Sequence, residues 1–181
     1  MGQPAAVGQW HFDEGLRDAT GRGNDAFARK AQFVPGRQGQ AARLDGEGLL
    51  VSDCAELRLA PGIRIECWFR CDAAPPVGGQ EIVAKPNEYM LRINPQNERG
   101  GFGFFLNLDG WEPRVESPAP VMPDVWYHLV AGWDGKELML SVNGEEFRRE
   151  RAGVPAHQNE PLRLGPLPGL IDELRIDNPG S

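Results

Sequence analysis

The best candidate for a catalytic pair of carboxylates in this chain is Asp172 with Glu173. Retaining glycoside hydrolysis needs two carboxyl groups about 5 Å apart, a separation that a strand offers between residues two positions apart on one face. Neighbouring residues of a strand point to opposite faces. Asp172 and Glu173 are therefore not placed to work together, which argues against a glycoside hydrolase.

Other catalytic arrangements are also missing from the sequence. There is no Gly-x-Ser-x-Gly nucleophile motif, and no HExxH-like spacing links His11, His128 and His157. We interpret His128 as a packed or surface residue of a strand, whereas His11 could reach solvent. Gly21-Arg22-Gly23 lies outside a strand-to-helix context, so it is not a phosphate loop. We expect no catalytic residues and no enzyme activity.

Asp172 has a second property that suggests a site. If the segment from Leu170 to Ile176 is a strand with strict alternation, Asp172 shares a face with Leu174 and Ile176. A carboxylate that points where apolar groups belong needs a cation or several hydrogen-bond donors.

Length and composition limit the class of protein. The 181 residues fit one domain, residues 1–181, and the 23 Gly and 16 Pro interrupt helices and supply turns. A formal net charge of −7 argues against nucleic acid as a partner. No apolar run approaches the roughly 20 residues of a membrane span, so we expect no membrane insertion. Met1–Pro4 does not begin a signal peptide, and the localisation stays open.

The three cysteines do not form a zinc-binding pattern. If Cys67 and Cys71 lie on one strand, their Cα atoms are about 13 Å apart, too far for a disulfide. A bridge from Cys54 to either one is open, but buried free thiols are the favoured state.

Period-2 alternation predicts an all-β chain, seen best where Ile63, Ile65, Cys67 and Phe69 alternate with polar residues and Trp68. Asp134-Gly135 and Asn143-Gly144 predict type I′ hairpins, in which both central residues have positive φ. The expected strands are 7–13, 26–33, 41–45, 49–51, 63–71, 81–85, 89–93, 101–108, 126–133, 137–142, 145–151, 162–164 and 170–176, with a loop at 75–79. About a dozen strands in one domain indicate an antiparallel two-sheet sandwich.

These segments resemble the laminin G-like jelly-roll domains of the concanavalin A-like lectin and glucanase superfamily. The resemblance is carried, in order, by Trp10–Gly15 with Asp18–Asp25, Gly39–Gly46, Ile65–Phe69, Ile82–Lys85, Trp126–Gly135 continuing to Val142–Gly144, and Gly169–Ile176. It implies a concanavalin A-like jelly roll and favours an extracellular or cell-surface domain of a larger protein or assembly. The glucanases of this superfamily carry Glu-x-Asp-x-x-Glu, and the segment around Asp172 lacks the first and last Glu.

The resemblance also implies a calcium ion near the pairing of the first and last strands. Its side-chain ligands would be Asp18, Asn24 and Asp172, with Asp13 as a fourth, because calcium accepts six to eight oxygens in flexible geometry. The alternative is that Asp18 and Asn24 form turns while Asp172 pairs with a neighbouring Arg.

The aromatic residues suggest where a ligand could bind. We expect Trp10, Trp126 and Trp133 in the core, whereas Trp111 lies on a turn, where a large aromatic can stack on a sugar or pack over the Pro113–Pro123 stretch. The sequence thus favours a calcium-stabilised lectin-like module that binds a glycan. A structural or adhesion domain that binds protein is the second hypothesis, and a glycan hydrolase or lyase the third.

Overall fold

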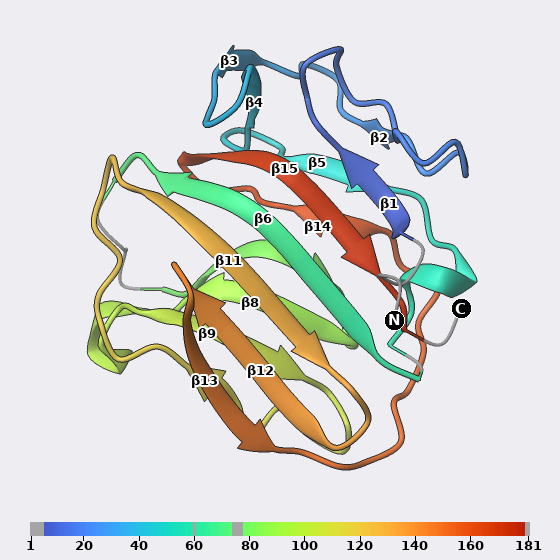
Figure 1. Cartoon of the computed structure of the whole chain (residues 1–181), viewed down its shortest axis with the longest axis vertical. Coiled ribbons are helices and arrows are strands. Elements are labelled where there is room, and N and C mark those ends of the chain that lie inside the picture. Colours follow the sequence, from blue (N-terminus) through green and yellow to red (C-terminus); the bar gives the residue numbers. More distant parts are fainter. Residues whose placement is uncertain (1–5, 60, 74–77, 180–181) are drawn as a thin grey trace.

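The protein is an all-β sandwich of two antiparallel sheets, as the sequence predicts (Figure 1). The computed structural model describes residues 6–59, 61–73 and 78–179. Met1–Pro4 and most of the predicted 75–79 loop lie outside the described residues. The described helices are two short 3₁₀ turns, η1 (Ala55–Leu57) and η2 (Gln96–Glu98). No helix in the described ranges has the length and apolar character that crossing a membrane requires.

The first sheet runs in the order β13-β12-β11-β6-β15-β4-β3, and β1 pairs with β15. Its front face is turned toward the viewer in Figure 1. The strands are β1 (Ala6–Trp10), β3 (Phe33–Pro35), β4 (Gln40–Arg43), β6 (Ile63–Cys71), β11 (Trp126–Trp133), β12 (Glu137–Val142), β13 (Glu145–Glu150) and β15 (Gly169–Asp177).

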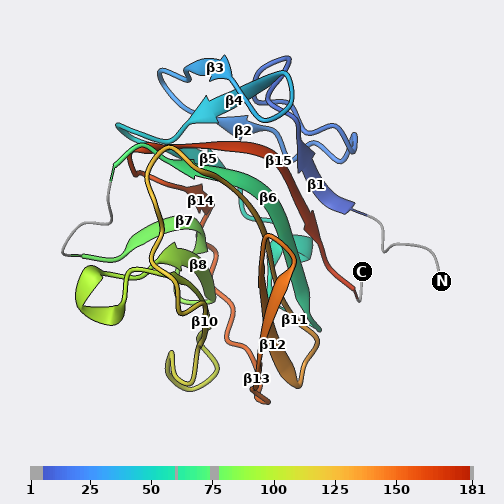
Figure 2. The same ribbon diagram turned by 60° about the vertical axis from the view of Figure 1, so that its left-hand side comes forward.

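The second sheet packs behind the first and runs in the order β10-β9-β8-β7-β14-β5-β2. Figure 2 shows the two layers from the side. The strands are β2 (Ala26–Phe27), β5 (Leu49–Val51), β7 (Gln80–Lys85), β8 (Tyr89–Ile93), β9 (Phe102–Leu106), β10 (Val115–Glu116) and β14 (Leu162–Leu164).

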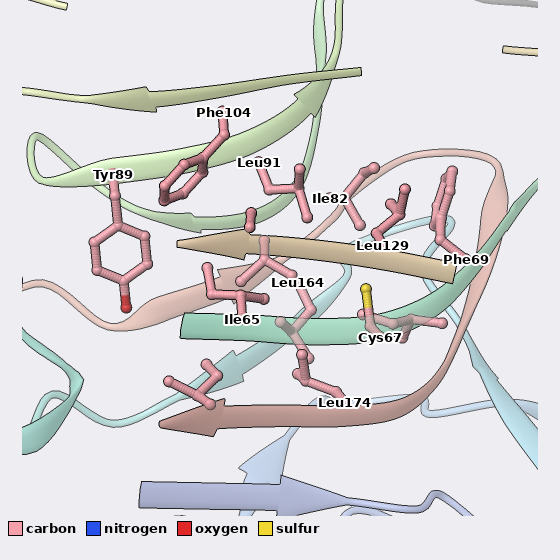
Figure 3. Close-up of a cluster of buried hydrophobic side chains, with 14 of the residues drawn as sticks. Ile65, Cys67, Phe69, Ile82, Tyr89, Leu91, Phe104, Leu129, Leu164 and Leu174 are labelled. Carbon is pink, nitrogen blue, oxygen red and sulfur yellow. The ribbon is translucent and has the colours of Figure 1, made fainter. Parts of the chain in front are cut away.

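The core lies between the inner faces of the two sheets. Every second residue of β6, from Ile63 to Cys71, is buried, so the predicted alternation is confirmed. Figure 3 shows Cys67 of β6 and Leu174 of β15 facing Leu91 and Leu164 of the second sheet. All three cysteines are free thiols. Burial raises the pKa of Cys67 to about 12, so its thiol is protonated and behaves as a small apolar group.

The hairpin at Asn143-Gly144 has positive φ at both residues, 51° and 89°, as predicted. At Asp134-Gly135 the hairpin is confirmed but the type I′ turn is wrong, because only Gly135 has positive φ. The Asp134 carboxylate instead accepts the N–H groups of Lys136 and Glu137 and closes a longer loop.

The predicted strand 26–33 is also wrong, because its ends belong to different sheets. Ala26 and Phe27 pair with β5 in the second sheet, whereas Phe33 pairs with Ala42 of β4 in the first. The residues between them cross from one layer to the other. This crossover lies at the top of Figures 1 and 2, between the edge strands β2 and β3.

A buried charged cluster fastens the long connection between β13 and β14. Lys85 is 0% exposed, and its Nζ lies 2.7 Å from Asp53 Oδ1 and 3.4 Å from Glu88 Oε1. It also donates to the carbonyl oxygens of Gln158 and Glu160. A buried ammonium is tolerated only with such partners. The cluster therefore holds the connection against the β7–β8 hairpin.

Candidate functional site

The loop between β1 and β2 is organised by the carboxylate of Asp18. Its Oδ1 accepts the N–H groups of Gln9 and Thr20, and its Oδ2 accepts that of Asn24 at 3.1 Å. The Thr20 hydroxyl also donates to it. Burial alone would raise the Asp18 pKa, but the hydrogen bonds from Thr20, Gln9 and Asn24 outweigh it and the pKa is lowered. Asp18 is therefore an ionised group that shapes the loop.

Asn24 ties the same loop to β1. Its Nδ2 donates to the carbonyl of Val7 at 2.8 Å, and its own carbonyl accepts the indole N–H of Trp10 at 3.0 Å. The Trp10 ring is fully buried, so this contact anchors the loop to the core. Asp18 and Asn24 thus form turn contacts, which the sequence analysis gives as the alternative to calcium binding.

Asp13 and Asp172 meet at a different element, the turn at residues 36–40 between β3 and β4. Asp172 Oδ2 accepts the N–H of Gln38 at 2.9 Å, and Asp13 Oδ1 accepts the N–H of Gln40 at 2.8 Å. The two pairs of predicted ligands, Asp18 with Asn24 and Asp13 with Asp172, are not connected by any hydrogen bond among the described residues. The donor to Asp172 is a backbone N–H, so the predicted pairing with an Arg is wrong.

The strict alternation predicted around Asp172 is also wrong. Asp172 lies opposite Trp68 of β6 and Arg175 lies opposite Glu66, so the register shifts between them. Glu173 takes a φ of 49° at this bulge. The bulge turns Asp172 to the outer face of the first sheet, beside Trp68, while Leu174 and Ile176 stay in the core.

Asp172 is nevertheless 0% exposed, because the 36–40 turn covers it. Burial raises its pKa, and the N–H groups of Gln38 and Arg37 offset only part of the effect. Its Oδ1 atom is buried and has no hydrogen-bond partner among the described residues. The structure therefore contains a buried carboxylate that the described protein groups satisfy only on one oxygen.

Two strained residues border the same corner. Phe12 is buried with a φ of 65°, which ends β1 at Trp10 instead of the predicted Asp13, and Glu173 is strained at the bulge. His11 Nδ1 lies 2.6 Å from Glu173 Oε2, and the His11 ring reaches solvent as predicted. A depression of about 300 Å³ opens here, lined by His11, Phe12, Asp13, Glu14, Gly15, Arg17 and Ala19. Backbone strain often accumulates at functional sites.

These residues fit a calcium ion only in part. Among the described residues, no three His, Cys, Asp or Glu side chains gather as a metal-binding group. The hydrogen bonds that the Asp18 carboxylate already accepts use much of its capacity as an acceptor, which leaves little of it for a cation. The unpartnered Oδ1 of Asp172 is the one feature of the set that suits a hard cation.

The tryptophans divide into core and surface residues. Trp10 and Trp133 are buried, as predicted, but Trp126 is only half-buried, because its position opposite Arg70 places it on the outer face of the first sheet. Trp68 is also half-buried there, with the Arg37 guanidinium 4.6 Å from its ring centroid. Trp111 is half-buried on the β9–β10 loop, and its indole N–H has no partner among the described residues.

The aromatic with the greatest exposure is one that sequence reasoning missed. Phe27 is 49% exposed and lies opposite Leu50 on the outer face of the second sheet. It lines a depression of about 430 Å³ with Ala28, Arg29, Glu47, Gly48 and Leu50. Within the predicted strand 26–33, alternation puts Phe27 on the same face as the charged Arg29. This polar neighbour was the signal in the sequence for an exposed Phe27.

A second depression of about 400 Å³ adjoins the first and shares Arg29 and Glu47 with it. The Arg29 N–H donates to Glu47 Oε1 at 2.6 Å. The other residues that line the second depression are Lys30, Gln32, Arg43, Asp45 and Gly46. We call the two depressions together the Phe27 trough. The side chains of Lys30, Gln32 and Asp45 make no hydrogen bond within the described residues, so they are available to a ligand.

Comparison with known sequences gives the family. A profile described as the concanavalin A-like lectin/glucanases superfamily matches residues 46–178, well over half of the chain. The chain belongs to this superfamily. The match confirms the resemblance seen in the sequence, and the superfamily fold accounts for the two-layer jelly roll. No curated protein matches the sequence significantly.

Solved structures of this superfamily fold are similar over most of the chain. Domain 4 of AbnA, a GH43 extracellular arabinanase from Geobacillus stearothermophilus in complex with arabinotriose, has a TM-score of 0.74 at 20% identity, covering 99% of this chain and 97% of that one. The binding domain of botulinum neurotoxin DC in complex with SialylT has 0.73 at 12%, covering 96% and 47%. Mouse laminin α1 domains LG4-5 have 0.55 at 19%, covering 88% and 46%.

Proposed function

We propose that this chain is a non-catalytic glycan-binding module and that the Phe27 trough is its binding site. The observation that carries the proposal is the exposed Phe27 ring within a depression whose rim has unused polar side chains. Sugars bind through the stacking of their C–H faces on aromatic rings and through hydrogen bonds from their hydroxyls. The trough offers both kinds of contact.

The shape of the trough favours an oligosaccharide over a single sugar. The first depression supplies an apolar surface from Phe27 and Leu50, and the second supplies Lys30, Gln32 and Asp45. Arg29 and Glu47 border both, so a chain of sugars would contact them at its middle. Arabinotriose and SialylT, named with two of the similar structures, support a glycan as the ligand class. The three similar structures are parts of larger proteins, and we propose the same for this chain.

Isothermal titration calorimetry against a panel of neutral oligosaccharides, with arabinotriose included, tests the site. Phe27→Ala should weaken binding at least tenfold, about the loss expected when an aromatic contact is removed. Val154→Ala is the matched control, because Val154 is 87% exposed and does not line the trough. Trp111→Ala in the same assay tests the Trp111 site. Equal affinities for the wild type and Phe27→Ala would contradict the trough.

The same oligosaccharide panel distinguishes glycan binding from the two alternative functions, a glycan hydrolase or lyase and a structural or adhesion domain. Hydrolysis would release reducing ends from the oligosaccharides, and we expect none. A structural or adhesion domain would bind no sugar but would associate with itself or with a protein.

We propose further that calcium stabilises the domain at the β1–β15 corner. Asp172 Oδ1 supports this proposal, because it is a buried carboxylate oxygen without a described partner. Asp172 would supply the first ligand, Asp13, which binds the same turn, the next, and Asp18 and Asn24 would act through the neighbouring loop. A bound calcium ion would supply charge compensation and loop order, and it would take no part in chemistry.

A further inference from the structure

A separate groove lies between the edge strands β10 and β13. Among the described strands, β10 pairs only with β9 and β13 only with β12, so each ends its sheet. The two edges lie side by side, at the lower side of Figure 2. The groove between them has a volume of about 390 Å³, within the range of small-molecule sites. It is lined by Glu112, Arg114, Val115, Glu116, Phe147, Arg148 and Arg149.

Arg149 occupies an unusual position in this groove. In the β12–β13 register Arg149 lies opposite Leu138 and Phe147 lies opposite Leu140, and both leucines are core residues. Residues opposite each other in an antiparallel pair point to the same face. Arg149 therefore extends from the inner side of the first sheet, beyond the end of the core, toward β10.

The other guanidinium that lies between the two edges is saturated. Arg114 binds Glu116 at 2.9 Å, Glu112 at 2.9 Å and Glu98 at 3.0 Å. Burial alone would lower the pKa of Arg114, but the three carboxylates together outweigh it and the pKa is raised. Arg114 is thus fixed in place, and it holds Glu112 and Glu116 at the rim of the groove.

The remaining arginines nearby are also occupied. Arg148 pairs with Glu137 at 2.7 Å and with Glu146 at 2.8 Å. Arg151 donates to the carbonyl oxygens of Gly110 and Glu112, which fixes the β9–β10 loop. Arg149 alone among the groove cations has no ion-pair or hydrogen-bond partner in the described part of the chain. It is exposed at the rim.

We propose that this groove is a second binding site, which takes a carboxylate-bearing sugar such as a uronic acid. The Arg149 guanidinium is a planar fork that matches a carboxylate. Glu112 and Glu116, already oriented by Arg114, accept bonds from sugar hydroxyls, and Phe147 with Val115 provides an apolar floor. The flanking glutamates repel a doubly charged phosphate more than a singly charged carboxylate, which favours the carboxylate.

The site is independent of the Phe27 trough. The two share no lining residue, and their strands lie toward opposite edges of the sheets, β10 and β13 at one edge and β2, β5 and β4 toward the other. The failure of either proposal therefore leaves the other untouched.

Calorimetry with trigalacturonic acid and with its fully methyl-esterified form tests the groove on the intact chain. The ester removes the charge and keeps the rings, so we expect the acid to bind at least tenfold more tightly, as for the loss of a charged hydrogen bond. Arg149→Ala should lower affinity for the acid by a similar factor and leave affinity for the ester unchanged. Arg149→Lys should recover only part of the loss, because it keeps the charge without the fork.

Arg22→Ala is the matched control, since it removes one exposed positive charge away from the groove. It should leave binding of the acid unchanged. Equal affinities for acid and ester, or for the wild type and Arg149→Ala, would overturn the proposal. If Arg149→Ala then forms dimers in sedimentation experiments, Arg149 is an inward-pointing charge that protects an edge strand, and the groove is not a sugar site.

Discussion

Asp13 and Asp172, from opposite ends of the chain, hold the same five-residue turn by accepting the N–H groups of Gln40 and Gln38. The turn lies over the outer face of β15, where a side chain would otherwise meet solvent. It therefore converts Asp172 from a surface carboxylate into a buried one. The N-terminal loop, the β3–β4 hairpin and the last strand thus form one connected unit.

This unit gives a test for calcium. Asp172→Asn keeps an oxygen that can accept the Gln38 N–H but removes the charge that would bind a cation. If calcium binds only the folded protein, a hundredfold excess over its Kd stabilises the wild type by about 2.7 kcal/mol, roughly 5–10 °C in Tm at this length. Asp172→Asn should lose this increase and should melt no lower than the wild type in EDTA.

Thermal unfolding in EDTA, followed by addition of calcium, measures both effects. Asp109→Asn is the control, because Asp109 is exposed and makes no side-chain contact among the described residues. It should respond to calcium like the wild type. A wild-type Tm that is identical with EDTA and with calcium would eliminate the stabilising ion.

The second prediction concerns Gly39 in the same turn. Gly39 has a φ of +50°, and a Cβ atom there would collide with the Asp13 carboxylate. Gly39→Ala should cost about 2–4 kcal/mol, from the left-handed backbone and from loss of the Asp13 to Gln40 bond. Gly23→Ala has a similar φ of +83° but an open environment, so it should cost only about 1–2 kcal/mol.

Urea unfolding of both variants gives the comparison. In the double variant Asp13→Ala/Gly39→Ala, the loss of unfolding free energy should be smaller than the sum of the losses in the two single variants. The reason is that the Asp13 carboxylate contributes to both losses. Simple additivity would mean that Asp13 and Gly39 do not interact in solution.

The sequence predicts the fold well where a single local rule decides the outcome. In β6 the period of two places Ile65 and Cys67 in the core, and at Asn143-Gly144 the requirement for positive φ determines the hairpin. These patterns need no information from distant parts of the chain. The superfamily resemblance adds the two-sheet jelly-roll fold.

The site is predicted less well, because distant residues decide it. The bulge at Glu173 reverses the face of Asp172, and no local pattern signals it. The Phe27 trough is lined in part by residues 28–32, which cross between the sheets instead of continuing the predicted strand. Arg149 likewise looks like an ordinary charge on an exposed strand until β10 is placed beside it.

The third prediction concerns thiol chemistry. Cys67 is fully buried with a pKa of about 12, so its reactive thiolate is scarce and inaccessible. Cys54 is only half-buried, although burial raises its pKa as well. Iodoacetamide at pH 8 should therefore modify Cys54 first in the folded protein and modify Cys67 only on unfolding. Peptide mass spectrometry over time would show the order, and equal labelling rates would contradict the buried position of Cys67.

The last prediction concerns pH and the cluster around Lys85. The hydrogen bond from Arg58 lowers the pKa of Asp53 most, burial opposes it, and Lys85 lowers it further. Because the folded pKa lies below the unfolded value of about 3.9, the Asp53 carboxylate stabilises the protein above that value. This contribution is lost as the pH falls through the folded pKa.

Asp53→Asn should therefore destabilise the protein by about 2–3 kcal/mol at pH 7, because Lys85 keeps Glu88 and two carbonyls but loses its nearest carboxylate. The difference from the wild type should be constant from pH 5 to 7 and shrink toward zero as the pH drops below about 4. Urea unfolding at a series of pH values measures it, with Asp109→Asn as the control. A difference that persists undiminished at the lowest pH would mean that Asp53 acts through its shape and not through its charge.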